Sequence, residues 1–420
     1  MRTMKGSSWR LGLWGALLGA VWVFSTTSAS AQTQTATCSD ENSCVIATDR
    51  AASLLVYPKV VVDTSNGVDT IIQLTHTSDR RTVDVLCFWV NANGRCAATG
   101  AICQSHLDCQ TGDTCVPGWE QRDFRLTLTK RQPVSWKASE GASFLPCDPA
   151  APDAASCIVD DQGQPIFNSG SVPPVQEDPF VGELKCIQID ENDRPVDFNE
   201  LKGEATIVRT RPGTGASGGV DVAKYNAVGI QAIPGRNDQD NVLCIGGDSP
   251  TGDCPQGAEY AACPQVLIMN HFFEGATEGA TQSTVRSNLT LVPCAQDFET
   301  GVNNLATRTT VQFLIFNEFE QRTSTSYRIA CFDERPLADI DTRPGPADDQ
   351  WSIFSIGTQG TLTGQTRLRP VSVNGEARGF LAVLEEFHDS CSNSPDGVCT
   401  AMVGLHYQGK RTLPDLVRLP

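Results

Sequence analysis

Strand-like alternation of apolar and polar side chains is the feature that most restricts how this chain can fold. Residues 124–129 (FRLTLT) alternate with a period of two, and residues 70–75 and 82–90 are rich in β-branched and aromatic side chains. The turn-like sequence SDRR lies between the last two segments, so residues 70–90 are predicted to form a β-hairpin. No long amphipathic helix follows the first 31 residues, and 36 glycines and 24 prolines interrupt the chain at short intervals. We therefore predict an all-β protein.

Five strand-like segments of the first half recur in the same order in the second half. The alignment matches Gln73 with Gln312 and Cys87 with Cys331, and the extra residues of the first copy lie between its strand segments. We interpret this pattern as duplication of one β-domain. The matched segments are residues 54–58, 70–74, 84–88, 182–187 and 227–230 in the first copy, and 289–293, 309–313, 327–332, 379–384 and 402–405 in the second.

The duplication predicts two tandem antiparallel β-sandwiches of immunoglobulin-like character. The first would span residues 32–275 and carry Cys-rich loop insertions at 96–115 and 237–263, and the second would span 286–420. Residues 276–285 are predicted to be a linker, because small and polar residues dominate there. The run IQLTHTSD in the predicted hairpin resembles strands of bacterial extracellular immunoglobulin-like domains.

The N-terminus has the pattern of a signal peptide. Basic residues between Arg2 and Arg10 precede an uncharged apolar run at 11–24, and the small residues 29–31 (ASA) provide a cleavage site near Ala31. The apolar run is shorter than the ~20 residues that span a bilayer, and no second long apolar run follows. We therefore expect a soluble protein that is secreted, either extracellular or periplasmic, with no direct membrane insertion.

The charge of the chain excludes some partners. Its formal net charge is −17, and cleavage of residues 1–31 would remove only cations. Such an acidic surface repels nucleic acid and anionic head groups, so nucleic acid is not expected as a partner.

The 17 cysteines all follow the predicted signal peptide and predict disulfide bonds. No C-x-x-C occurs, which argues against zinc ribbons and thioredoxin-like redox sites. Because the number is odd, at least one cysteine must lie outside the internal pairs, and we expect it among Cys244, Cys254 and Cys263. The other candidates are the pairs Cys38–Cys44, Cys87–Cys186, Cys147–Cys157, Cys294–Cys331 and Cys391–Cys399, and the set Cys96, Cys103, Cys109 and Cys115, whose spacing resembles small disulfide knots of exported bacterial proteins.

Two glycine-rich patterns overlap at residues 213–219. Residues 213–218 match the G-x-G-x-x-G pattern of dinucleotide sites, and Ser217 stands at the centre of a G-x-S-x-G nucleophile pattern. Both motifs work only where a strand leads into a helix of an α/β sheet, and the surrounding sequence shows no βαβ alternation. We therefore interpret both as chance matches in a glycine loop, and we assign no catalytic residue.

Metal sites have two candidate locations. Glu386 and His388 would project from one face of a strand and could bind a metal with His406, although a solvated strand end is the preferred interpretation. The acidic loops at 190–197 and 237–241 offer oxygen ligands for calcium, but neither follows the EF-hand pattern, and Asp and Asn are also common turn residues. We assign no metal and no cofactor, and calcium remains an alternative.

The function expected from these features is non-enzymatic. A stiff β scaffold with variable loops is typical of binding modules, so we expect a secreted or envelope-surface binding or structural protein with an extracellular or cell-surface macromolecule as partner. One alternative is a secreted hydrolase centred on Ser217 or on Glu386 and His388. Another is a component of an extracellular assembly, linked by a disulfide or by strand addition. The tryptophans are expected in the core or packed under loops, or alternatively as an exposed platform for sugars: Trp89, Trp119, Trp136 and Trp351.

Overall fold

The computed structural model describes most of the chain after residue 37, and residues 35–420 form one compact unit. Antiparallel strands dominate, and the helices are limited to the turns η1 (Thr64–Asn66) and η5 (Leu337–Asp339) and the short α1 (Ile356–Gln359) among the described residues. None of the helices in that part of the chain has the length and apolar character needed to span a bilayer. The described residues are 38, 43–103, 108–116, 118–143, 171–210, 219–247, 250–279, 282–299, 308–344, 350–371, 377–389 and 398–420.

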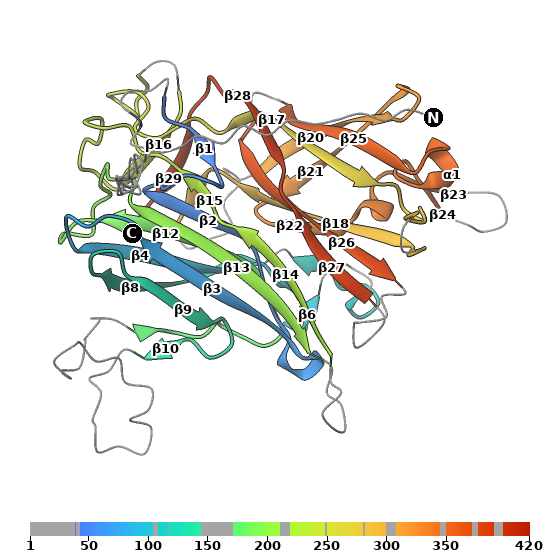
Figure 1. Cartoon of the computed structure of the whole chain (residues 1–420), viewed down its shortest axis with the longest axis horizontal. Coiled ribbons are helices and arrows are strands. Elements are labelled where there is room, and N and C mark those ends of the chain that lie inside the picture. The colour runs from blue at the N-terminus through green and yellow to red at the C-terminus, as the bar shows by residue number, and fades with distance from the viewer. Residues whose placement is uncertain are drawn as a thin grey trace, which may run out of the picture. The chain divides into compact units, whose positions relative to one another are not determined.

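Two antiparallel sheets of the first half bury a common core (Figure 1). In this core, Ile72 and Leu74 of one sheet pack in the same cluster as Trp89 and Phe124 of the other sheet. The six-stranded sheet has the order β1 (Ile46–Ala47), β15 (Val228–Ile230), β2 (Leu54–Val62), β12 (Phe180–Ile189), β4 (Val83–Asn91), β8 (Glu120–Leu128), and the four-stranded sheet has the order β14 (Val220–Asn226), β13 (Leu201–Thr210), β3 (Val68–His76), β9 (Pro133–Lys137). We call these two sheets the first sheet pair.

Two further antiparallel sheets form the second sheet pair (Figure 1). Phe313 and Leu368 of the five-stranded sheet pack with Leu289 and Leu384 of the four-stranded sheet. The five-stranded sheet has the order β21 (Arg322–Ala330), β20 (Arg308–Asn317), β25 (Thr363–Val371), β17 (Pro264–Phe272), β28 (His406–Lys410), and the four-stranded sheet has the order β22 (Asp333–Pro336), β18 (Val285–Pro293), β26 (Phe380–Asp389), β27 (Val398–Val403).

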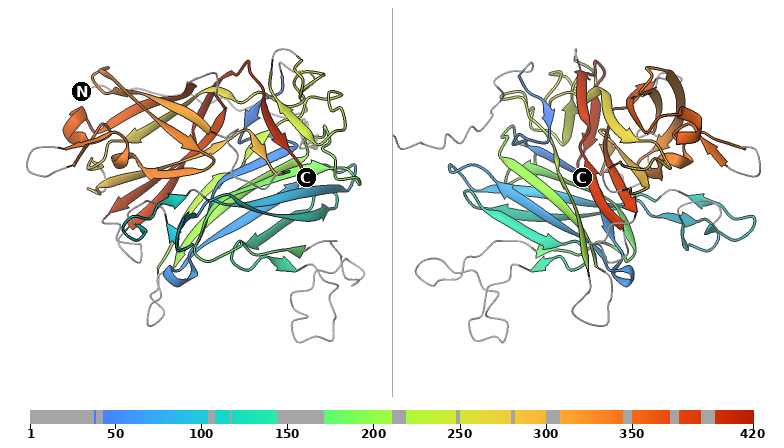
Figure 2. Two further views of the ribbon diagram at one scale, coloured as in Figure 1. Left: turned by 180° about the vertical axis from the view of Figure 1, so that it is seen from behind. Right: turned by 45° about the vertical axis from the view of Figure 1, so that its right-hand side comes forward.

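A third buried cluster joins the two sheet pairs. It covers the second face of the six-stranded sheet with side chains from both halves of the chain, such as Val56 and Phe88 with Phe298 and Leu381. The cover includes a three-stranded sheet of β16 (Val242–Ile245), β29 (Asp415–Arg418) and β19 (Gln296–Asp297), in which β19 and β29 are parallel. Smaller sheets are β10 (Ala142–Ser143) with β11 (Ser171–Val172), β23 (Thr342–Pro344) with β24 (Gln350–Ser352), and β5 (Gly94–Cys96) with β6 (Ile102–Cys103) and β7 (Cys115–Val116), which projects from the other sheets in Figure 2.

The strands differ in how much of their length is buried. β2 (LLVYPKVVV) and β12 (FVGELKCIQI) are buried along almost their whole length, because both faces of the six-stranded sheet are covered. β20 (RTTVQFLIFN) instead alternates buried and half-buried residues, because only one of its faces meets a core. Burial is therefore continuous where both faces are covered and alternates where one face is covered, although residues 313–316 of β20 (FLIF) are apolar on both faces.

The predicted hairpin at residues 70–90 is wrong. β3 belongs to the four-stranded sheet and β4 to the six-stranded sheet, so the connection between them crosses from one sheet to the other. Both strands bury apolar side chains in the same core, and the local sequence pattern is the same whether neighbouring strands pair or face each other.

The boundary predicted at residues 276–285 also needs correction. β17 precedes this segment, yet it pairs with β25 and β28 in the second sheet pair. Within the predicted linker, Ala276 is fully buried and its carbonyl accepts a hydrogen bond from Val285 N. The segment is thus a packed turn between β17 and β18 of one sheet pair, and residues 280–281 lie outside the described part of the chain.

The repeat alignment is partly out of phase with the strands. β3 and β20 agree in phase, since Ile72 and Val311 both face the core of their own sheet pair. Leu54 and Leu289 are aligned in sequence, but Leu289 faces the core of the second sheet pair while Leu54 faces the third cluster. A shift of one residue reverses the face of every side chain on a strand. The segments 84–88 and 327–332 differ further, because β4 lies beside β12 whereas β21 is the edge of a five-stranded sheet.

Six disulfides connect described cysteines. One of them, Cys263–Cys294, replaces the predicted Cys294–Cys331 pair, and Cys331 is a buried thiol. The expectation that the odd cysteine lies among Cys244, Cys254 and Cys263 is therefore wrong. The Cys263–Cys294 bond joins the residue before β17 to the residue after β18, and separation along the sequence did not predict this contact. The other five are Cys38–Cys44, Cys87–Cys186, Cys96–Cys109, Cys103–Cys115 and Cys244–Cys254.

Of the remaining cysteine candidates, the structure describes only Cys399. Cys399 is disulfide-bonded. Its predicted partner Cys391, and the pair Cys147 and Cys157, lie outside the described residues.

Candidate functional site

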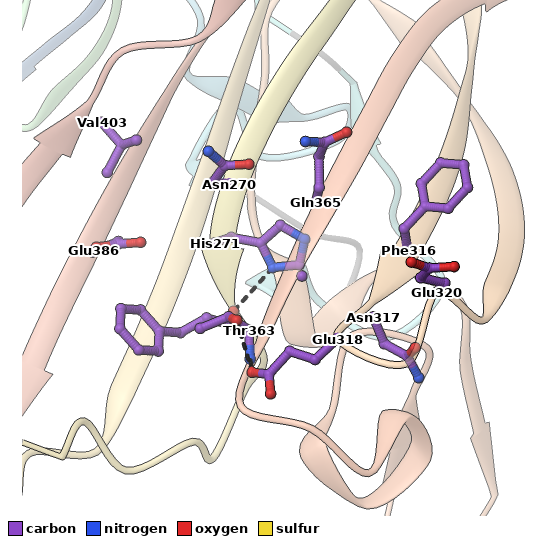
Figure 3. A pocket seen from close by; sticks show the side chains of 12 residues that line it. Asn270, His271, Phe316, Asn317, Glu318, Glu320, Thr363, Gln365, Glu386 and Val403 are labelled. Carbon is purple, nitrogen blue, oxygen red and sulfur yellow. Dashed lines mark hydrogen bonds between the residues drawn. The ribbon is translucent and has the colours of Figure 1, made fainter.

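A groove of about 660 Å³ lies on the second sheet pair, where β17 and β20 end and β25 begins (Figure 3). Asn270, Gln365 and Phe316 are direct cross-strand partners on these three strands, so their side chains form one row. β28 pairs with β17 only from Pro264 to Ile268, and Glu386 of β26 and Val403 of β27 line the groove near the end of β17. The groove is lined by Asn270, His271, Phe272, Phe316, Asn317, Glu318, Glu320, Thr363, Gly364, Gln365, Glu386 and Val403.

Strand alternation places the polar row in the groove and the apolar residues in the core. Leu267 and Met269 of β17 are fully buried, whereas Asn270 is exposed. At the other side of the groove, the tight turn between β20 and β21 is held by Asn317, whose Oδ1 accepts hydrogen bonds from Phe319 N and Gln321 N. This turn presents Glu318 and Glu320 at the end of the row.

His271 is a structural residue at the base of the groove. Its Nδ1 lies 3.1 Å from the Phe272 carbonyl oxygen and its Nε2 lies 2.8 Å from the Thr366 hydroxyl. Burial lowers the pKa of His271 to about 4. The ring is therefore neutral at pH 7, and both of its nitrogens are occupied.

The groove is negatively charged. Glu318 accepts hydrogen bonds from Thr363 N at 2.9 Å and from the Thr363 hydroxyl at 2.8 Å, and these bonds lower its pKa. Neither Glu318 nor Glu320 forms an ion pair with any residue that the structure describes. Among the described lining residues, none is Lys or Arg.

Glu386 and His388 lie on one face of β26, as the sequence predicts, at 3.6 Å between Glu386 Oε2 and His388 Nε2. The end of the strand is partly solvated: Glu386 is only 8% exposed and its burial raises its pKa, whereas His388 and Asp389 are half-buried. The rings of Phe272 and His388 make an edge-to-face contact, with their centroids 6.2 Å apart. His406 lies on β28, is exposed, and is not gathered with Glu386 and His388 into a metal-ligand set of the described residues.

Two polar side chains of the groove have no hydrogen-bond partner among the residues that the structure describes. The side-chain amides of Asn270 and Gln365 make no hydrogen bond with any described residue, and Figure 3 shows them side by side on neighbouring strands. Two exposed apolar side chains are neighbours in sequence of lining residues: Phe319, between Glu318 and Glu320, is 68% exposed, and Leu362, next to Thr363, is 42% exposed. Donors, acceptors and apolar surface are thus all available to a ligand.

The two acidic loops use their carboxylates as turn residues. Asp190 Oδ1 accepts hydrogen bonds from Asn192 N and Arg194 N, and Asp193 pairs with Arg125. In the second loop, Asp240 Oδ1 accepts a hydrogen bond from Val242 N. The metal-ligand sets found among the described residues consist of disulfide cysteines, with Asp415 in one of them, and include neither loop.

Several sequence candidates fall elsewhere. The glycine-rich residues 213–218, with Ser217, lie outside the described residues. Trp89, Trp119 and Trp136 are buried as expected, whereas Trp351 is 45% exposed. The aromatic rings of the groove are phenylalanines, which sequence reasoning missed. The only sequence signal for the row is the Asn-x-Phe alternation at the end of β17, since the pairing with residues 365 and 316 is not local.

Comparisons of this chain with models of protein families, with curated proteins and with solved structures give no match.

Proposed function

We propose that this chain is an exported, non-enzymatic binding protein built from two tandem immunoglobulin-like β-sandwiches, and that the groove at the end of the second one is its ligand site. The observation that carries the proposal is the row Asn270–Gln365–Phe316, which offers two unused amides and an aromatic ring on a stiff sheet. The partner is an extracellular or cell-surface macromolecule, because the groove is open and lies on an outer sheet.

The structural part of the proposal rests on the two sheet pairs. Each has its own core, and β2 with β12 and β18 with β26 are adjacent antiparallel strands in the same order along the chain. The first sandwich ends before Pro264 in this scheme, since β17 pairs with the second sheet pair.

Export is supported by the disulfides and by the leader-like N-terminus. Disulfides persist in oxidising compartments, and six of them join described cysteines spread from Cys38 to Cys294. Residues 1–31 would be removed as a signal peptide, so the binding form begins near residue 32.

A co-sedimentation experiment tests the binding site. Fluorescently labelled mature protein is mixed with the washed insoluble envelope fraction of its own source and centrifuged, and the bound fraction is measured over a concentration series. The double variant Asn270→Ala/Gln365→Ala is expected to bind at least tenfold more weakly than the unaltered protein. A matched control, Gln110→Ala/Gln256→Ala, removes two exposed amides elsewhere and is expected to bind normally.

Equal binding by all three proteins, or no binding by any, would contradict the proposal. Covalent labelling of Ser217 by a fluorophosphonate probe would favour the hydrolase instead. A covalent dimer that is lost on reduction would favour an assembly component.

A further inference from the structure

We propose that the ligand of the groove is a saccharide chain whose bound units are neutral or carry an amino group. This inference rests on the proposed function, because it names the ligand class of the same site. Three properties of the groove carry it: two unused amides, two half-buried aromatic rings, and an excess of carboxylates.

The amides match the hydroxyl groups of a sugar ring. Each carboxamide carries one acceptor oxygen and two N–H donors, so it can exchange paired hydrogen bonds with neighbouring hydroxyls. Asn270 and Gln365 are direct partners in the β17–β25 ladder, where side chains of opposed residues lie about 5 Å apart. Two such amides in register can hold successive hydroxyls along one edge of a pyranose.

The rings match the apolar face of a sugar. Phe316 continues the row beyond Gln365, and Phe272 lies on β17 two residues after Asn270. Both phenyl groups are only partly buried. An aromatic face pairs well with the C–H face of a pyranose, because it buries apolar surface and leaves no polar group unsatisfied.

The charges restrict which sugars fit. Glu318, Glu320 and Glu386 line the groove, and no lining residue among those described is a Lys or Arg. Glu318 is held in its ionised form by hydrogen bonds from Thr363. Uronates, sulfated sugars and phosphates would be repelled, whereas neutral hydroxyls donate to the carboxylates and an ammonium group is attracted to them.

A basic peptide is the main competing ligand, since acidic and aromatic side chains also attract lysine and arginine. It would use Glu318, Glu320 and the phenyl rings. Ammonium and guanidinium groups only donate hydrogen bonds, so the lysine and arginine side chains could use the amide oxygens of Asn270 and Gln365 but not their N–H donors, which would have to pair with carbonyl groups of the peptide backbone. The observations therefore favour the saccharide, and the peptide becomes an outcome of the test.

Selective destruction of the envelope ligand separates the two classes. Periodate, which cleaves vicinal diols and vicinal amino alcohols, is expected to reduce co-sedimentation of the unaltered protein at least tenfold, while protease treatment of the envelope fraction leaves it unchanged. Loss of binding after protease but not after periodate would assign a peptide ligand and overturn the inference. In that case the proposed function would stand if the Asn270→Ala/Gln365→Ala variant still fails to bind.

Competition with soluble probes tests the charge preference. Chito-oligosaccharides of the partly deacetylated type are expected to displace the labelled protein from untreated envelope, and oligogalacturonate of equal length is not. Phe316→Ala should raise several-fold the chito-oligosaccharide concentration that displaces half of the bound protein. Phe319→Ala should change this concentration less, because Phe319 is not a lining residue of the groove. Displacement by oligogalacturonate or by oligolysine, at concentrations where chito-oligosaccharides have no effect, would overturn the inference.

Discussion

At the scale of single residues, the least expected feature is a charge inside an apolar strand. Lys59 of β2 is 2% exposed, and its Nζ lies 2.7 Å from Glu385 Oε2 on β26 and also contacts Glu334. Burial alone would lower the pKa of Lys59, but the two carboxylates raise it. Arg209 pairs with the other oxygen of Glu385 at 2.6 Å. The lysine therefore stays charged, and it ties the two sheet pairs together.

Replacing Lys59 by Met is expected to lower the free energy of unfolding by roughly 3–5 kcal/mol, because the buried Glu385 loses the more deeply buried of its two counter-charges and keeps only the half-buried Arg209. Urea unfolding of the protein measures this change. Lys137→Met is the control, since Lys137 and its partner Glu140 are both exposed and such pairs contribute at most about 1 kcal/mol. Similar losses in both variants would contradict the interpretation.

Glu259 is the residue whose protonation should change stability near neutral pH. Its two carboxylate oxygens accept hydrogen bonds from Asp238 N and Cys244 N. Burial, with the nearby Asp238 and Asp240, raises the pKa of Glu259 from 4.5 to about 7. Between these values the folded protein retains a proton that the unfolded chain has released.

Stability contributed by Glu259 should therefore be present below pH ~4.5 and decrease as the pH rises to about 7. Glu259→Gln is expected to remove this part of the slope, which is of the order of 2–3 kcal/mol across the window. Urea unfolding at pH 5 and pH 8 measures it in both proteins. The exposed control Glu140→Gln should keep the slope of the unaltered protein, and an unchanged slope in Glu259→Gln would refute the assignment.

At the scale of elements, one disulfide lies within a sheet rather than between sheets. Cys87 of β4 and Cys186 of β12 are directly opposed in the six-stranded sheet, with a Cα–Cα distance of 4.1 Å. The bond closes a loop of 99 residues, and both sulfurs point into the core of the first sheet pair. A bond that closes so long a loop restricts the unfolded chain strongly.

The double variant Cys87→Ala/Cys186→Ala is expected to lose roughly 4–5 kcal/mol of unfolding free energy. Cys244→Ala/Cys254→Ala is a matched control with equally buried cysteines and a separation of 10 residues, and it should lose roughly 2–3 kcal/mol. Urea unfolding without reductant compares the two. An equal or larger loss in the control would show that loop length is not the dominant factor.

Element patterns also show which parts of the site were predictable. Glu386 and His388 on one face of a strand followed from their spacing of two. The neighbourhood of Asn270 did not, because Gln365 is 95 residues away on β25 and Phe316 is 46 residues away on β20. Alternation defines the two faces of each strand, but it contains no information on which strand lies beside it.

At the scale of the whole molecule, the described chain is held together by a cluster that belongs to both halves. Phe298, from the segment after β18, stacks on Phe88 of β4 with ring centroids 3.9 Å apart. Cys263–Cys294 joins the same cluster covalently. The six-stranded sheet cannot expose this face to water without losing much of its buried apolar surface.

Phe298→Ala is expected to lower the free energy of unfolding by roughly 3–5 kcal/mol, because it removes a buried ring from the shared cluster. Phe319→Ala, at an exposed position, should change stability by less than about 0.5 kcal/mol.

The unaltered protein should unfold in a single transition. The unfolding curve from tryptophan fluorescence of the buried Trp89, Trp119 and Trp136 should coincide with the curve from circular dichroism of the whole chain. Two separate transitions would indicate that the sheet pairs unfold independently.

The sequence by itself determined the all-β class and the disulfide-rich character. These properties are local, because side-chain alternation and cysteine content are written along the chain and depend little on which strands become neighbours.

The tertiary structure alone decided the pairing. It separated β3 from β4, moved β17 into the second sheet pair, joined Cys263 to Cys294 and brought Asn270 beside Gln365. Each of these contacts depends on burial shared between distant segments, and many alternative pairings bury the same apolar side chains. The choice among them is made by the packing of the complete set of strands, which no single stretch of sequence contains.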